Sequence, residues 1–383
     1  MKILDKVLTV IVYILTIAPY LFLGAYSADS ADKLIADDNT GLELMVMGGL
    51  IFLALIFMLI HIVIHEGGHM IMGLATGWKY LSFRVGSITL VKRDGKFQWK
   101  KTTVMGTGGQ CLMIPPECEP EKCPFFLYLL GGGLLNIVTG GIAFGIGMLT
   151  GGVPQIILNI FAIMGFGLGL SNLFPAKVSG TMNDGYQIFF ELPRNPKART
   201  AQYCLLSANA ILTEAESTKD LPEKLIGTIL NFDYSNLNDT ATANLLLYKA
   251  TILQEESRYD ETKEIFQHIA DSPDTLQLFK NEAKCELMYY EIMGGCDAEK
   301  IDSLYDNKQA EYIKATSLYP SRRRLMYAYY LLYKDDKAKA EEEYQALLKT
   351  AKSHPIKADG AIELKEAERV KAYYDERRSK QEA

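Results

Sequence analysis

The chain has 383 residues and a formal net charge of −6, and its mean hydropathy is +0.03. The length suggests two or three domains, and the acidic balance argues against a nucleic-acid-binding protein, which concentrates Lys and Arg on one face. Six cysteines are too few for a disulfide scaffold, and their scatter indicates reduced thiols that face a cytosol.

Four apolar segments are each near the length of about twenty residues that a membrane-spanning helix needs. The first could instead be a cleaved signal peptide, because Lys2 and Lys6 precede it and Ala25-Tyr26-Ser27 resembles a cleavage site. Its apolar run is longer than a typical signal core, so we expect a retained helix. The predicted spans are residues 7–26, 44–64, 125–149 and 155–174.

Basic residues set the expected orientation of these spans. The loop of residues 27–40 is acidic except for Lys33, whereas the segment between the second and third spans carries eight Lys and Arg residues. Excess Lys and Arg mark the cytoplasmic side of a membrane. We therefore expect both termini in the cytosol if the first helix is retained.

The second span leads into the sequence His65-Glu66-Gly67-Gly68-His69. On a helix, residues four apart share a face, so both histidines can bind one Zn²⁺ ion while Glu66 reaches a water molecule on it. The alternative is a pair of histidines at a membrane interface, but ionisable residues at membrane depth are usually functional. His61, one turn earlier, is expected to pack between helices or to support a ligand.

A stretch of alternating apolar residues from Leu81 to Val91, followed by Asp94-Gly95, predicts a β-hairpin over residues 79–103. The exposed edge of this hairpin could pair with an unwound substrate peptide. Alternatively, the hairpin only covers the site formed by the two histidines. The glycines at positions 106, 108 and 109 predict a flexible segment. The nearby Cys111, Cys118 and Cys123 lack the spacing of a zinc ribbon and are expected to be plain thiols.

A catalytic zinc site normally has three protein ligands, and Asp184 is the candidate for the third. Taken alone, Asp184-Gly185 would be a surface turn. It follows the fourth span and Asn172-Leu173-Phe174-Pro175, where proline should interrupt the helix. Freed backbone groups at membrane depth must be buried in protein or line a wet cavity, which favours a ligand.

After about residue 195 the sequence predicts a soluble helical region. Helix pairs are expected at residues 241–256 with 259–270, 276–292 with 298–305, and 322–333 with 337–351, and a terminal cap at 361–378. Pairs of this length resemble tetratricopeptide-type repeats and predict a solenoid. A compact helical bundle without a binding surface is the alternative.

These motifs, in this order, resemble the site-2 protease family of intramembrane metalloproteases. The matching residues are His65, Glu66 and His69, a small-residue stretch ending in Asn136, Asn172 with Pro175, and Asp184 with Gly185. The resemblance covers about residues 44–192. Asn183 is a departure, because many members have an apolar residue there.

The resemblance implies that His65, His69 and Asp184 bind Zn²⁺, that Glu66 is the catalytic base, and that Asn136 and Asn172 bind the substrate backbone or the oxyanion. An asparagine at bilayer depth also commonly bonds a neighbouring helix, and both interpretations of Asn136 stay open. The implied enzyme is an intramembrane zinc metalloendopeptidase of a prokaryotic cytoplasmic membrane. Its substrate would be a membrane-anchored protein or peptide in regulated proteolysis, or a signal or pheromone peptide.

The expected fold is an α-helical membrane protein of four transmembrane helices with a β-hairpin insertion, followed by a cytoplasmic all-α solenoid. Its expected domains are residues 1–43, a metalloprotease core at 44–195 and the helical repeats at 196–383. The lipid bilayer and a cytoplasmic protein that binds the repeats are the expected partners, and nucleic acid is not. The alternative function is an inactive membrane-tethered scaffold, although retention of all four site residues favours an enzyme.

Overall fold

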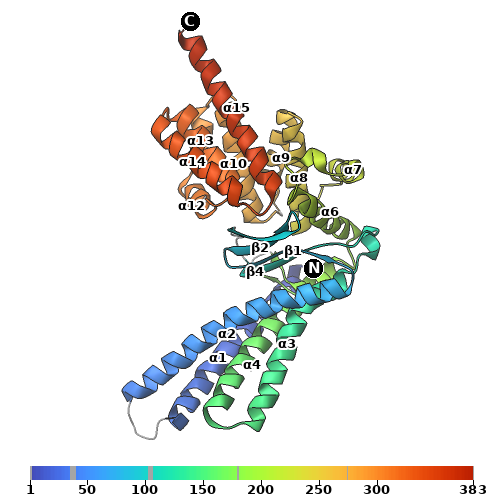
Figure 1. Cartoon of the computed structure of the whole chain (residues 1–383), viewed down its shortest axis with the longest axis vertical. Helices are drawn as coiled ribbons and strands as arrows, with labels where there is room; N and C mark the ends of the chain where they lie inside the picture. Colours follow the sequence, from blue (N-terminus) through green and yellow to red (C-terminus); the bar gives the residue numbers. More distant parts are fainter. Residues whose placement is uncertain (1, 35–39, 102–106, 179–180, 274, 383) are drawn as a thin grey trace. The chain divides into compact units, whose positions relative to one another are not determined.

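The computed structural model describes residues 2–34, 40–101, 107–178, 181–273 and 275–382. The chain is mostly helical and divides into two compact units (Figure 1). The first unit contains Met1–Val85 and Gly108–Arg199, and the second contains Gly86–Thr107 and Thr200–Ala383. The two boundaries near residues 85 and 108 both fall inside the region where the sequence predicts a hairpin.

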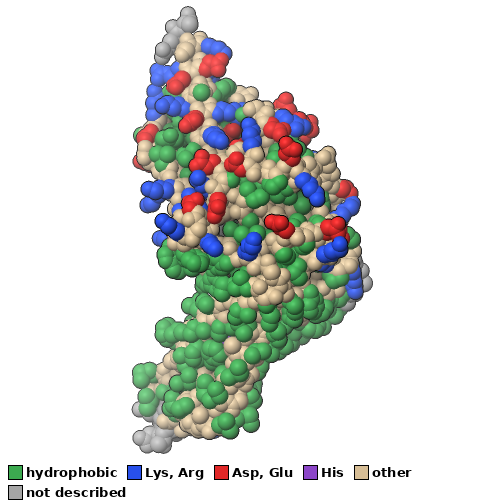
Figure 2. Space-filling model, turned by 45° about the vertical axis from the view of Figure 1, so that its right-hand side comes forward, with side chains coloured by type: hydrophobic (Ala, Val, Ile, Leu, Met, Phe, Trp, Pro, Cys, Tyr) green, Lys and Arg blue, Asp and Glu red, His purple; other side chains and the backbone are tan. Residues whose placement is uncertain are grey.

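The first unit contains four helices that are long and apolar enough to cross a membrane. Their surface on the face shown in Figure 2 is largely hydrophobic, whereas Lys, Arg, Asp and Glu gather over the later helices. This confirms the four predicted segments, and the second helix continues well beyond residue 64, so the histidine motif is helical. The helices are α1 (Lys2–Leu34), α2 (Thr40–Ala75), α3 (Phe125–Leu149) and α4 (Gly152–Leu173).

Helix α3 packs against both α2 and α4. At the α2–α3 crossing, Gly68 and Gly131 bring the two backbones together, since a Cβ atom on either would overlap the carbonyl group of the other. Small residues allow such close approach between membrane helices, where lipid supplies little driving force of its own. The crossing therefore places α3 directly beside the histidine motif of α2.

A four-stranded antiparallel sheet lies in the chain between α2 and α3, with strand order β3-β2-β1-β4. The predicted Asp94-Gly95 turn is confirmed: both residues have positive φ angles, 52° and 70°, as a two-residue hairpin turn requires. The hairpin prediction is too small, because Gly109 begins a fourth strand and is not part of a flexible segment. Gly106 lies outside the described residues. The strands are β1 (Lys79–Val85), β2 (Ile88–Arg93), β3 (Lys96–Lys101) and β4 (Gly109–Ile114).

Short elements link the membrane helices to the rest of the chain. A 3-10 turn, η1 (Pro120–Lys122), precedes α3. Helix α4 ends just before Pro175, as expected for a residue that cannot continue the backbone ladder. After it come β5 (Lys177–Val178), β6 (Thr181–Met182), α5 (Asp184–Tyr186), the π-helical turn η2 (Gln187–Glu191) and α6 (Pro196–Leu212).

The C-terminal region is helical, as predicted, and its three expected helix pairs correspond to α8 with α9, α10 with α11, and α13 with α14. The sequence did not predict α6, α7 or α12, and the third pair contains a π-helical turn, η4. A core of small, aliphatic and tyrosine side chains runs through α8–α15. The elements are η3 (Thr218–Asp220), α7 (Glu223–Asn231), α8 (Thr240–Glu255), α9 (Tyr259–Asp271), α10 (Gln277–Met293), α11 (Ala298–Leu304), α12 (Asn307–Ala315), α13 (Pro320–Ala328), η4 (Tyr329–Tyr333), α14 (Lys337–Ser353) and α15 (Lys357–Glu382).

Candidate metal centre

The structure brings the two motif histidines and Asp184 together in the first unit. Helix α2 presents His65 and His69 on one face, and their Nε2 atoms lie 3.1 Å apart. Asp184 begins α5, and its Oδ2 atom lies 3.2 Å from His65 Nε2 and 3.4 Å from His69 Nε2. Both histidines are buried. Residues that are more than a hundred positions apart in the chain thus converge on one point, as a ligand set must.

Asn183 explains how the Asp184 carboxylate is aimed. It caps α5 by accepting hydrogen bonds from the backbone N–H groups of Tyr186 and Ala176, at 2.9 and 3.0 Å. Its amide nitrogen donates to the carbonyl oxygens of Ser171 and Phe174, at 2.8 and 2.7 Å. With all four bonds made, Asn183 ties the end of α4 to α5 and leaves Asp184 to face the histidines.

The three ligand atoms fit a tetrahedral metal ion. With zinc bonds of about 2.0–2.1 Å, two ligand atoms of a tetrahedral site lie about 3.3 Å apart, which matches all three separations. Asp184 Oδ2 is buried and has no hydrogen-bond partner, although buried oxygens normally have one. A Cβ atom at Gly132 would lie 2.5 Å from His69 Nε2 and 2.7 Å from His65 Nε2. The glycine therefore leaves open the space beside both ligand nitrogens.

The far nitrogen of each imidazole also has a contact. His69 Nδ1 lies 2.8 Å from the carbonyl oxygen of Tyr128 on α3, so it carries the proton and donates it there. His65 Nδ1 lies 3.4 Å from the Asn136 side chain, also on α3. Such outer contacts fix which ring nitrogen is free to bind a metal, and for His69 that nitrogen is Nε2.

Glu66 is buried beside the ligands and interacts electrostatically with His65, His69 and Asp184. The backbone N–H of Cys111 in β4 donates a hydrogen bond to the Glu66 carboxylate, and the carbonyl of Cys111 accepts one from the Tyr128 hydroxyl at 2.6 Å. Strand β4 thus fixes the carboxylate through its own backbone. Burial raises the pKa of the Cys111 thiol to about 12.

Two predicted substrate-binding asparagines have different surroundings. Asn136 is fully buried next to His65. Asn172 donates to the carbonyl of Leu168 in its own helix at 3.1 Å. The sequence did not reveal the contacts of Tyr128 and Cys111, because they depend on backbone atoms, and it marked Gly132 only as part of the small-residue stretch that ends in Asn136. The three-glycine run at 131–133 was the one signal in the sequence that pointed to this position.

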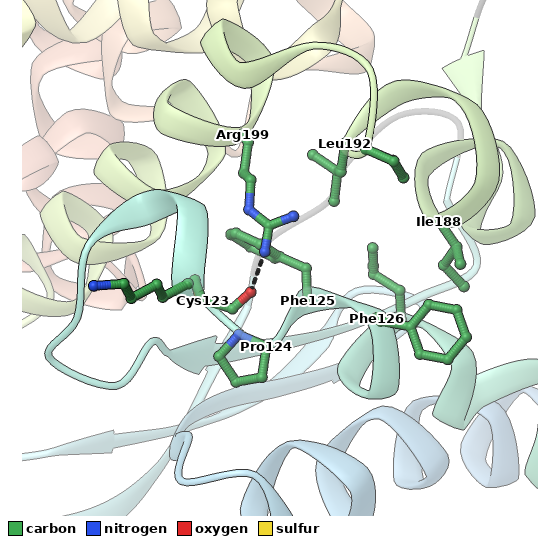
Figure 3. A pocket seen from close by; sticks show the side chains of 10 residues that line it. Cys123, Pro124, Phe125, Phe126, Ile188, Leu192 and Arg199 are labelled. Carbon is green, nitrogen blue, oxygen red and sulfur yellow. Dashed lines mark hydrogen bonds between the residues drawn. The ribbon is translucent and has the colours of Figure 1, made fainter.

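A separate cavity of about 230 Å³ lies on the same unit, at the N-terminal end of α3 (Figure 3). Arg199 closes one side of it by donating to the carbonyl oxygens of Pro120 and Cys123, at 2.8 and 2.6 Å. Ile188 and Leu192, from the segment that follows Asp184, form another wall. None of the three ligand residues lines it, so this cavity is distinct from the metal centre.

Comparisons of the chain with protein-family models, with curated proteins and with solved structures give no match. Among the described residues, His65, His69 and Asp184 form the group of His, Cys, Asp or Glu side chains that could hold a metal ion. In the described parts of the chain the cysteines form no disulfide bond and no such group.

Proposed function

We propose that this protein is an intramembrane zinc metallopeptidase that hydrolyses peptide bonds in membrane-anchored proteins or peptides. The observation that carries the proposal is the triangle of His65, His69 and Asp184, whose edges match those of a tetrahedral zinc site, with a buried glutamate directly beside it. Three protein ligands and one open position are typical of catalytic zinc, whereas structural zinc is closed by a fourth ligand.

In this proposal His65, His69 and Asp184 would hold a zinc ion, which when bound would supply Lewis acidity and lower the pKa of water toward neutrality. Glu66 accepts a proton from the attacking water at its carboxylate and delivers it to the departing amine. The N–H of Cys111 keeps the Glu66 carboxylate oriented for that transfer. Burial of the site excludes bulk water, which strengthens each of these electrostatic interactions.

The membrane setting supports a membrane-anchored substrate. His65, Glu66 and His69 lie within a helix that is apolar and long enough to span a bilayer, and a soluble peptide would have little access to such a position. The Lys- and Arg-rich segment between α2 and α3 favours a cytoplasmic location for this end of α2. The helical region after residue 200 would then lie on the same side, where we propose that it binds a cytoplasmic protein or recruits the substrate.

The test compares the wild type with Glu66→Gln, each expressed with host membrane proteins. New protein N-termini should form only with the wild type, because the amide cannot accept a proton from water. Glu66→Gln should still bind one zinc ion per chain, since all three ligands remain. Glu43→Gln, a change at a half-buried residue in the first turn of the same helix, far along the chain from the ligands, is the matched control and should cleave normally. Equal cleavage by Glu66→Gln and the wild type would refute the proposal.

A further inference from the structure

Asn136 and His61 are two fully buried polar residues beside His65. A neutral imidazole that binds a metal through Nε2 must carry its proton on Nδ1. His69 satisfies this condition, because the Tyr128 carbonyl can only accept a hydrogen bond. For His65 the neighbour of Nδ1 is the Asn136 side chain, which can accept only through Oδ1.

The orientation of the Asn136 amide therefore decides whether His65 Nδ1–H has a hydrogen-bond acceptor. The Nδ2 atom of this amide lies 3.4 Å from His65 Nδ1, so two N–H donors would face each other. Its Oδ1 atom is buried without a hydrogen-bond partner. The oxygen and nitrogen of an amide have nearly the same shape, so a half-turn of the group exchanges them without other movement. After that exchange, Oδ1 accepts the proton of His65 Nδ1.

His61 supplies an independent observation on the opposite side of Asn136. Its Nε2 atom lies 2.9 Å from the carbonyl oxygen of Phe161, so Nε2 carries the proton. The remaining nitrogen, Nδ1, is then an acceptor, and it is buried without a partner. Because Asn136 interacts with this ring and Nδ1 is its acceptor nitrogen, the half-turn makes Asn136 Nδ2–H the donor available to His61 Nδ1, so a single change can satisfy both orphaned atoms.

We propose that Asn136 and His61 form a chain of hydrogen bonds that fixes the tautomer and rotation of His65. In this chain His61 Nε2–H donates to Phe161, Asn136 Nδ2–H donates to His61, and His65 Nδ1–H donates to Asn136. Both are positioning residues, because they act on the metal through His65. The inference rests on the proposed metal site and gives Asn136 a role other than substrate binding.

The test measures zinc affinity of the full-length protein in detergent by competition with a chelator, together with the visible spectrum of the Co²⁺-substituted protein. Asn136→Leu keeps the volume and removes the acceptor, so zinc affinity should fall about 10- to 100-fold, as for other lost outer contacts of metal-binding histidines. Asn136→Asp keeps an acceptor and should retain most of the affinity. Asn159→Leu is the matched control: Asn159 is a membrane-helix asparagine that bonds Tyr26, away from the metal ligands, and its affinity should equal that of the wild type.

His61→Phe provides a second test that does not depend on Asn136→Leu folding. It keeps a ring in the same place and removes both nitrogens, so affinity should fall by a smaller factor and the Co²⁺ bands should shift in the same direction. Wild-type affinity in both Asn136→Leu and His61→Phe would overturn the inference and leave the zinc site intact. An equal loss in Asn136→Asp and Asn136→Leu would also overturn it. A wild-type protein that binds no metal would instead refute the proposed function.

Discussion

At the scale of single residues, the candidate metal centre depends on Gly132, which has no side chain, as much as on its ligands. Gly132→Ala should prevent zinc binding, because the new Cβ would lie within 2.7 Å of both ligand nitrogens, closer than two such atoms can approach. Elemental analysis of the detergent-purified protein should give less than a tenth of the wild-type zinc content. Gly141→Ala, on the same helix with nothing within 4 Å of the new atom, should bind zinc normally. Full zinc content in Gly132→Ala would mean that the ion lies elsewhere.

The meeting of the three candidate ligands was predictable from sequence, whereas the residues around them were not. His65, Glu66 and His69 follow from helical spacing, and Asp184 follows from its place after a span and a proline. The structure brings the three proposed ligands together. Asn136 and Asn172 look alike in the sequence, since each is an asparagine in an apolar helix. Only the crossing of α3 with α2 decides that Asn136, and not Asn172, touches a ligand.

At the scale of elements, the junction of α4 and α5 depends on Asn183. Asn183→Ala removes four hydrogen bonds and should lower the free energy of unfolding by about 2–4 kcal/mol. Zinc affinity should fall as well, because Asp184 would lose its fixed position. Asn195→Ala removes another cap in the same unit, on α6. It should be only slightly destabilising and should leave zinc affinity unchanged. Thermal melting and chelator competition on both variants would check this.

Element prediction succeeded where one strong physical signal dominates. The four spans are long apolar runs, and the Asp94-Gly95 turn needs positive φ angles that few other pairs adopt. Strand β4 was missed because Gly109 and the two glycines shortly before it suggested flexibility, although Gly109 pairs with Val85 of β1. Helix α12 was missed because its short length gives few turns for a periodic pattern.

Helices α10, α13 and α15 are joined by buried charges. Arg324 lies between Glu286, at 2.7 Å, and Glu363, at 2.6 Å, and is almost fully buried. Burial raises the pKa of Glu363 to about 7, and the pairing with Arg324 only partly opposes this. Between about pH 4.5 and 7, Glu363 is therefore protonated in the folded protein but ionised in the unfolded chain.

The sign of the pH effect follows from this difference in proton binding. The stabilising contribution of Glu363 is fully present below pH 4.5 and is lost as the pH rises through about 7. The melting temperature of the helical region should fall by a few degrees between pH 5 and pH 8. Glu363→Gln should reduce this dependence, whereas Glu368→Gln, an exposed change on the same helix, should keep it. A wild-type melting temperature that rises over this range would contradict the assignment.

At the scale of the whole molecule, the sheet is divided between the two units. Strands β1 and β4 belong to the first unit, which contains the four apolar helices and is called the membrane unit below. Strands β2 and β3 belong to the second unit, with the helices after residue 200. The backbone N–H of Asp94 donates to Glu214, and Lys100 donates to the carbonyl of Lys352. The sequence suggested continuous domains because periodicity describes neighbours along the chain and carries no information about such distant contacts.

The membrane unit should therefore hold zinc by itself once its two chain segments are joined. Val85 is paired with Gly109 across β1 and β4, so a short Asn-Gly turn can replace residues 86–107, and the chain can end at Arg199. Every proposed ligand and its contacts lie within the remaining residues. We expect the shortened protein to insert in membranes, to remain helical and to bind one zinc ion per chain.

The same shortened protein with His69→Ala is the matched control and should lose the ion. A second variant that deletes only residues 200–383 should become sensitive to protease at residues 86–101, because Thr89 and Val91, now buried, would lose the helices that share their unit. Its zinc content should stay at one per chain. A folded, membrane-inserted short form without zinc would show that the metal centre requires the second unit, and the ligand geometry described for the first unit would then be insufficient.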